Sequence, residues 1–337
     1  MSKKHKKPLA PGRAKRTQTP PMAILNSPTT HMERANRAIG KLLATHRFDS
    51  LDDVNAFLQK TIASGDLGRI IQGQPSDPRE QAQELAYRAM EAGTAQKACR
   101  LAEQALKLDA DCVDALVILA QAQRLSTQDY IQRMRAAVEA GERSLGPDFV
   151  EENKGHFWGI VETRPYMRAR WELALALAGS QQFPQAIREL EALIELNPND
   201  NQGARDYLLS LYLLTGDLRG ADGLFKQYPK DAMATFAWGK VLRHLIAQNA
   251  PGARAALQAA RKTNPHVLSY LSGRKRMPRE SPGYYSPGDD SEAVNCVMVL
   301  GPAWLAHPPA LFWLLGRADK IQQAAEAASG LEAPKLS

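Results

Sequence analysis

The residues of this sequence best suited to chemistry lie in one stretch from His156 to Arg170, HFWGIVETRPYMRAR. Aromatic and charged side chains are interleaved along it. Arginine guanidinium groups bind carboxylates through paired hydrogen bonds, and Trp and Tyr side chains anchor many protein interfaces. The stretch therefore indicates a surface that binds a peptide, and its candidate partner-binding residues are Trp158, Glu162, Arg164, Tyr166 and Arg168.

The same stretch has a structural interpretation that the sequence leaves open. It interrupts a series of helix pairs, and a segment inserted between two pairs must seal the interface between them. Its glutamate and arginine side chains would then only neutralise one another.

Other kinds of site find little support in the sequence. His156 and Glu162 are six positions apart, which matches neither of the zinc-binding spacings HxxxH and HExxH. The sequence has no glycine-rich phosphate loop, and no Ser or Cys stands in a known nucleophile motif. We therefore predict no catalytic residue, no cofactor and no metal, and an enzyme built on this stretch remains a third alternative.

The elements that must position these residues are pairs of short helices. Residues 167–200 form a 34-residue unit whose large and small apolar residues follow the tetratricopeptide pattern. Ala174 and Ala186 fall where the two helices cross, so both must be small. Pro198 cannot continue the second helix and closes the unit. The remaining pattern positions hold Leu173, Leu177, Phe183 and Leu190.

The pattern recurs from residue 79, and further pairs are expected at 113–144, 201–228 and 231–263. One pair cannot bury its own apolar face, so the pairs must stack. We predict an all-α fold, a tetratricopeptide-like superhelical solenoid of helical hairpins with a C-terminal helical cap. The array spans 79–271 with an insertion at 146–165. The first helices line a concave groove, which adds Tyr87, Trp171 and Leu175 to the candidate partner-binding residues.

The N-terminal part carries the excess charge. Residues 1–16 hold seven of the 43 Lys and Arg residues and no acid, so the other 36 balance the 36 Asp and Glu residues and the +7 belongs to this tail. We expect a disordered basic tail over 1–30, for which a solvated leader is the simpler interpretation and nucleic-acid binding the alternative.

Residues 31–78 are expected to form a helical segment and a linker. In a helix over 31–46, Ala38, Ile39, Leu42 and Leu43 would lie on one face. Ser50 would cap a second helix, whose apolar stripe is Leu51, Val54, Phe57, Leu58 and Ile62.

Residues 272–337 are expected to form a loop and the helical cap. A helix capped by Asp290 or Ser291 would run to about Ala306, and a last helix would follow Pro308 and Pro309. Residues 293–315 carry no formal charge, but Pro302 and this proline pair interrupt them, so we expect no membrane span.

The three cysteines, Cys99, Cys112 and Cys296, form no CxxC pair and no disulfide framework. Cys99 and Cys112 are expected to be small core residues. Together with the lack of a secretory signal, these features predict a reducing, cytoplasmic location.

A longer resemblance covers about two thirds of the chain, from about Gln83 to Leu315. The blocks HFWGIVETRPYMRAR, LNPNDNQGAR, NPHVLSYLSGRKRMP and YYSPGDDSEAV resemble a group of bacterial tetratricopeptide proteins of unassigned biochemical role. That group is similar, over its C-terminal part, to the suppressor-of-tumorigenicity-seven family of eukaryotes. The resemblance implies an all-α repeat protein, brings no catalytic residues and leaves the basic tail outside.

The first functional hypothesis is a non-catalytic interaction scaffold that binds a partner peptide or helix in the concave groove. The best-known tetratricopeptide clamp for C-terminal carboxylates uses Lys, Arg and Asn at groove positions that here hold Gln83, Tyr87, Trp171 and Leu175. An adaptor for chaperone tails is therefore disfavoured. The alternative is a nucleic-acid- or ribosome-associated factor that uses residues 1–16. Partner identity and oligomeric state cannot be read from the sequence.

Overall fold

The computed structural model describes residues 29–71, 73, 75, 77–280 and 283–317. All regular secondary structure in these ranges is helical, which confirms the all-α prediction. The predicted tail lies outside the described residues, except that Thr29 and Thr30 begin the first helix and so do not belong to a disordered tail.

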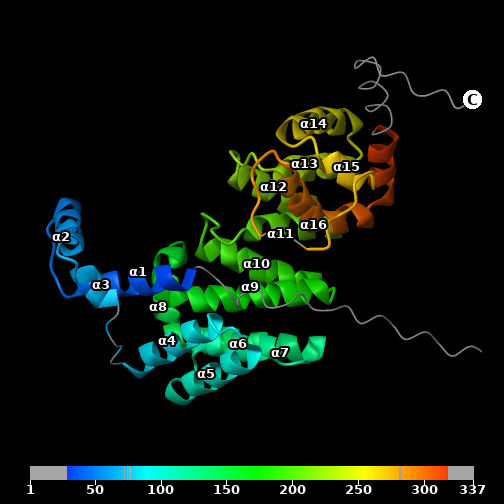
Figure 1. Ribbon diagram of the computed structural model, residues 1–337. Coiled ribbons are helices and arrows are strands. Elements are labelled where there is room, and N and C mark those ends of the chain that lie inside the picture. The colour runs from blue at the N-terminus through cyan, green and yellow to red at the C-terminus, as the bar shows by residue number, and fades with distance from the viewer. Residues whose placement is uncertain (1–28, 72, 74, 76, 281–282, 318–337) are drawn as a thin grey trace, which may run out of the picture.

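Consecutive helices pair along the chain, and the first helices of neighbouring pairs contact one another in three cases, α4 with α6, α6 with α9 and α11 with α13 (Figure 1). Five pairs follow each other between residues 78 and 263. They are α4 (Pro78–Met90) with α5 (Ala95–Leu108), α6 (Val113–Ala122) with α7 (Thr127–Leu145), α9 (Arg164–Gly179) with α10 (Phe183–Leu196), α11 (Ala204–Thr215) with α12 (Leu218–Gln227), and α13 (Ala234–Ile246) with α14 (Ala250–Thr263).

The central pair, α9 with α10, shows why these residues fold in this way. Ala174 and Ala186 are both fully buried, and the two helices pack directly on each other. Small side chains at a helix crossing let the backbones approach closely enough for their neighbours to interdigitate. Arg188, on the other face of α10, is exposed. The crossing positions predicted for residues 167–200 are therefore confirmed in their burial.

The insertion is shorter than predicted and is well packed. It consists of α8 (Pro147–Glu152) and two short 3-10 turns, η1 (Phe157–Gly159) and η2 (Val161–Thr163). The Thr163 hydroxyl donates to the carbonyl oxygens of Phe157 and Ile160, which ties the two turns together. Helix α9 already begins at Arg164, because Pro165 is well suited to the first turn of a helix. Arg164 and Pro165 therefore belong to α9 and not to the insertion.

Three helices precede the pairs: α1 (Thr29–Ala44), α2 (Leu51–Ala63) and α3 (Asp66–Ile71), of which α3 was not predicted. The Ser50 cap of α2 is confirmed, since the Ser50 hydroxyl accepts a hydrogen bond from the Asp53 amide at 3.2 Å. The sequence indicates an apolar stripe along α2, but no residue of α2 is buried. Figure 1 shows this helix standing away from the helix pairs.

The C-terminal part contains α15 (Val267–Leu271), α16 (Asp290–Ala306) and a further helix, Pro308–Arg317. The cap of α16 is Asp289, not Asp290 or Ser291, because an Asp289 oxygen accepts from the amides of residues 291 and 292. Helix α16 packs against α11, α13 and α15, and it buries Leu300 and Trp304 almost completely. The predicted continuation of the last helix beyond residue 317 lies outside the described residues.

No single helix in the described ranges has both the length and the apolar composition needed to cross a membrane. Only α16 and helix Pro308–Arg317 reach that length and composition together, and they meet at an angle of 117°.

Candidate functional site

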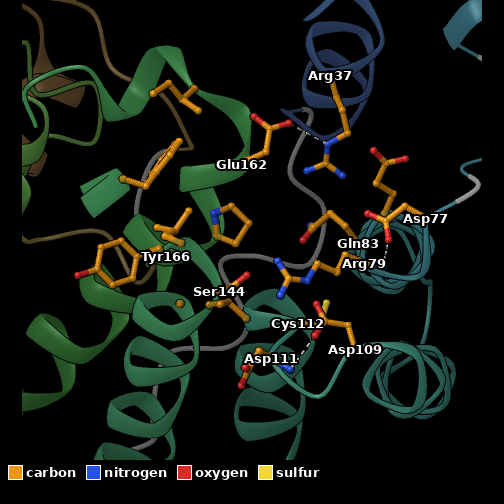
Figure 2. A pocket seen from close by; sticks show the side chains of 17 residues that line it. Arg37, Asp77, Arg79, Gln83, Asp109, Asp111, Cys112, Ser144, Glu162 and Tyr166 are labelled. Carbon is orange, nitrogen blue, oxygen red and sulfur yellow. Dashed lines mark hydrogen bonds and ion pairs between the residues drawn. The ribbon is translucent and has the colours of Figure 1, made fainter. Parts of the chain in front are cut away.

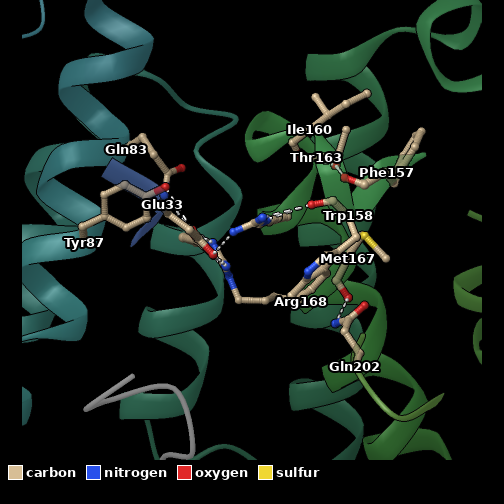
Figure 3. Close-up of polar contacts among 12 residues, drawn as sticks. Glu33, Gln83, Tyr87, Phe157, Trp158, Ile160, Thr163, Met167, Arg168 and Gln202 are labelled. Atoms are coloured by element: carbon tan, nitrogen blue, oxygen red, sulfur yellow. Dashed lines mark hydrogen bonds and ion pairs between the residues drawn. The ribbon is translucent and has the colours of Figure 1, made fainter. Parts of the chain in front are cut away.

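Helix α1 lies over the face that α4, α6, α9 and η2 form, and this face is the candidate functional site (Figures 1 and 3). We call it the α1-covered face. The side chains by which α1 contacts it are spaced i, i+3, i+4, i+7 and i+11, so they form one stripe along the helix. That stripe is entirely polar: Thr30, Glu33, Arg34, Arg37 and Lys41. The apolar residues that the sequence places on one face of α1 are only half-buried: Ala38, Ile39, Leu42 and Leu43.

Arg168 of α9 stands at the centre of the α1-covered face (Figure 3). Its Nε and Nη2 donate to the two carboxylate oxygens of Asp114 on α6, at 2.9 and 2.6 Å. Its Nη1 and Nη2 donate to the carboxylate of Glu33 on α1, at 2.7 and 3.2 Å. Both carboxylates are buried, with Asp114 fully inaccessible and Glu33 only 2% exposed. One guanidinium group therefore joins two buried acids from two different helices.

The charged state of this centre follows from its geometry. Burial by itself lowers the pKa of Arg168, but the carboxylates of Asp114 and Glu33 raise the pKa above its ordinary value. Arg168 is thus a permanent cation. A buried cation with two well-placed carboxylate partners is far less costly than an unpaired one.

Two side chains of α4 complete the centre. The Tyr87 hydroxyl donates to Glu33 at 3.0 Å, and the Gln83 amide donates to Asp114 at 2.6 Å. Burial raises the pKa of Tyr87 above its ordinary value, so its hydroxyl keeps its proton and remains a donor. Glu33 therefore accepts from a tyrosine and an arginine that sit on separate helices.

The two arginines of α1 meet the other edge of α4. Arg34 donates to Glu84 at 2.8 Å and pairs with Glu91. The guanidinium groups of Arg34 and Arg37 lie 5.2 and 5.6 Å from the centre of the Tyr87 ring, within the range of cation–π attraction. Arg37 also lies 3.6 Å from the Glu162 carboxylate of η2.

Arg164, in the first turn of α9, is fixed by the insertion. Its Nε and Nη2 donate to the carbonyl oxygen of Trp158 at 3.1 and 3.0 Å, and its guanidinium lies 4.9 Å from the centre of the Trp158 ring. Its Nη1 is then left 3.7 Å from Glu33. The insertion therefore places a second cation beside the buried glutamate.

The structure brings five of the predicted partner-binding residues together and separates three. Tyr87, Arg164, Arg168 and Glu162 contact α1, and Trp158 supports Arg164. Tyr166 lies against α7 instead, where a Cβ at Gly141 would come within 2.6 Å of the Tyr166 ring. Trp171 packs edge-on against Tyr207 with ring centres 5.1 Å apart. Leu175 is half-buried further along α9.

Three residues of the centre were missed by the sequence reasoning: Glu33, Gln83 and Asp114. Two signals were available for them. Asp114 is the only charged residue in the helix Val113–Ala122, whose other residues apart from Gln121 are apolar, and an unpaired acid there would be costly. The polar residues of α1 repeat with helical spacing, as the apolar ones do, so the sequence of α1 contains two stripes and not one.

Two cavities border the α1-covered face. One, of about 370 Å³, lies between Arg37 of α1 and side chains from α4, α6, α7 and the insertion, and Figure 2 shows Arg37, Glu162 and Tyr166 around it. The other, of about 360 Å³, lies between α1 and α4 and is lined by Ala38 and Leu42. Apolar residues of α1 therefore face open space where a tightly packed helix would fill it.

A second polar cluster lies at the opposite end of the helix series. Glu292 of α16 is 2% exposed and accepts from the amides of Ala234 and Gly288 and from the Asn264 side chain, all within 3.0 Å. These bonds lock the start of α16 to α13 and to the end of α14.

Asp206 of α11 lies near this second cluster and is less well satisfied. Its Oδ1 is buried and has no hydrogen-bond partner in the described part of the chain. Burial, followed by the nearby Asp231 carboxylate, raises the pKa of Asp206 to about 7. Within the same ranges, no three His, Cys, Asp or Glu residues are arranged to hold a metal ion.

Comparison with known proteins adds no assignment. No protein-family model matches the chain, and no curated protein sequence matches it significantly.

Proposed function

We propose that this protein is a non-catalytic interaction scaffold, a tetratricopeptide-like helical repeat protein that binds a helical segment of a partner on the α1-covered face. The observation that carries the proposal is the seating of α1. Helix α1 belongs to none of the pairs, and side chains from α4, α9 and η2 hold it on this face. A face that positions hydrogen-bonding groups for one helix is suited to bind another helix of the same chemistry.

The charges of the face argue for recognition more than for stability. Replacing a buried ion-pair centre by apolar residues often leaves stability unchanged or improves it, so such centres are weak stabilisers. They do discriminate strongly between partners, because a ligand without the matching group leaves a buried charge unpaired. Arg168, joined to both Asp114 and Glu33, has this property.

The arrangement of the helix pairs also supports a repeat array. The contacts of α4 with α6, α6 with α9, and α11 with α13 are those expected of stacked hairpins. The free cysteines Cys99, Cys112 and Cys296 support a cytoplasmic location.

Affinity capture from the source lysate with the full-length chain tests the proposal. We expect a partner that is retained by the wild type, lost with Arg168→Met and weakened with Glu84→Gln, a milder change at the rim of the face. Arg188→Met removes the same charge from an exposed site on α10 and should retain the partner. A partner captured equally by all four proteins, or turnover of a small molecule by the purified chain, would overturn the proposal.

A further inference from the structure

We propose that α1 is a releasable internal occupant of the α1-covered face, and that the partner which replaces it presents the same charge stripe on a helix. That stripe is a glutamate followed directly by an arginine, with a second arginine three positions later, as in Glu33, Arg34 and Arg37. This inference rests on the proposed function, since it names the ligand class and the regulation of the same face.

The contacts of α1 are of the kind that can open without unfolding the protein. Its backbone runs close to α3 and η2, whereas it meets α4 and α9 through long polar side chains. Apart from Thr30 and Glu33, none of its described side chains is buried. No apolar side chain of α1 itself therefore has to leave a fully buried position when α1 is released, and burial of apolar side chains is the main term that resists opening.

Helix α16 provides the contrast within the same chain. It lies against α11 and α13 through a continuous apolar face and buries Val294, Cys296, Leu300, Ala303 and Trp304. Exposing these side chains would cost much more than exposing the polar stripe of α1. We therefore assign α16 to the permanent core, whereas α1 is bound reversibly to the α1-covered face.

The two cavities bordering α1 support the same assignment. Arg37 lines both cavities, of about 370 and 360 Å³, and the second also leaves Ala38 and Leu42 incompletely packed. A partner helix with larger side chains at those positions has space for them. It would add apolar contacts that α1 does not make, and this gives the partner an advantage over α1.

The chemistry of the partner follows from what the face offers. Arg168, Arg164 and the Tyr87 hydroxyl converge on one carboxylate. A neutral side chain in place of that carboxylate would leave these groups without a charged acceptor. One helical position further on, Glu84 and Glu91 bind a guanidinium. One turn later, the Tyr87 ring and Glu162 receive a second guanidinium.

Because α1 is part of the same chain as the face it covers, it competes strongly with a free helix for that face. A tethered ligand acts at an effective concentration in the millimolar range. A free helix with the same stripe is therefore a weak competitor of the wild-type chain and a much better ligand once the internal helix is weakened.

The test uses the full-length chain and a fluorescein-labelled synthetic peptide with the sequence of residues 29–44, with binding followed by fluorescence anisotropy. We expect the peptide to bind the Glu33→Gln chain at least ~10-fold more tightly than the wild-type chain. A peptide carrying the same Glu33→Gln change should bind that chain at least ~10-fold more weakly than the unchanged peptide. Adding Arg168→Met to the host should abolish binding, while adding Arg188→Met should leave it unchanged.

Hydrogen exchange on the unmodified wild-type chain measures release directly. We expect the amides of α1 to exchange at least ~100-fold faster than those of α16, and saturating peptide to increase the exchange of α1 further. Equal protection of α1 and α16 overturns the release of α1 while leaving the proposed function standing. Fast exchange of α1 without peptide binding to the Glu33→Gln chain overturns the proposed function. Light scattering tests a second copy of the chain as the occupant. If the wild type is a dimer and Glu33→Gln is a monomer, α1 of a second copy occupies the face, and the proposal of an internal occupant is overturned.

Discussion

Replacing Arg168 with methionine tests the centre of the α1-covered face most directly. The substitution keeps most of the side-chain volume and removes four hydrogen bonds of 2.6 to 3.2 Å to two buried carboxylates. Glu33 can reach water if α1 leaves the face. Asp114 belongs to α6 and does not leave with α1, and of the hydrogen bonds described above only that of the Gln83 amide would remain to it. We expect the free energy of unfolding to fall by about 3–5 kcal/mol, the usual result of leaving one charge of a buried pair alone.

Urea denaturation of Arg168→Met and of the matched Arg188→Met variant measures this loss. The exposed Arg188 should change stability by less than ~0.5 kcal/mol. The double variant Asp114→Leu with Arg168→Met should recover most of the loss, because it removes both charges from the interior. If Arg168→Met is as stable as Arg188→Met, or if the double variant loses the sum of both single effects, the centre does not carry the energy assigned to it.

Three further predictions follow from other parts of the chain. Ala186→Leu at the fully buried crossing of α9 and α10 should cost about 1–3 kcal/mol by overpacking, and a urea midpoint equal to that of Arg188→Ala would contradict this. The pKa of Asp206 is about 7 in the folded chain and about 4 when unfolded, so folding takes up a proton and stability falls as the pH rises between these values. Asp206→Asn should remove this pH dependence of stability and raise the free energy of unfolding at pH 8 by about 1–3 kcal/mol. Urea denaturation at pH 5 and pH 8 measures both effects. An unchanged pH dependence would show that Asp206 is not its source. If residues 1–16 bind nucleic acid, the affinity of the full chain for single-stranded RNA should fall steeply with salt, and residues 17–337 should bind much more weakly. Equal affinities of the two proteins would show that residues 1–16 do not determine RNA binding.

The helix pairs could be predicted from the sequence because their signal is local and repeated. The alternation of small and large residues around Ala174 and Ala186 depends on contacts within one pair, and the burial of both confirms it. Helix boundaries were also close, since Ser50 caps α2 as its sequence indicates. The position of α1 was not predictable in this way. Its apolar residues mark one face of the helix, but a hydrophobic stripe does not indicate which other helices α1 contacts.

The candidate site illustrates the same limit. The residues Arg164 and Arg168 stood out by type, and the structure places both beside Glu33. Their partners come from helices far away in sequence, so no spacing rule connects them. Trp171 and Leu175 were chosen by repeat position and Tyr166 as an aromatic anchor of the stretch. Tyr166 packs against α7 and Trp171 against Tyr207 instead. A buried carboxylate shared by several donors is a property of the tertiary structure, and only the isolated acid in α6 and the polar stripe of α1 hinted at it.

The grip of Asp114 on Arg168 has a consequence for the rate and strength of binding. Two of the guanidinium's hydrogen bonds go to an acid that stays in place whether or not α1 is present. The arginine is therefore held in its binding rotamer before any ligand arrives. Ordering a long side chain on association normally costs about 0.5–1.5 kcal/mol, and here that entropy has already been lost during folding. An incoming helix therefore meets an Arg168 guanidinium that is already oriented, and its binding free energy is not reduced by the entropy cost of ordering this side chain.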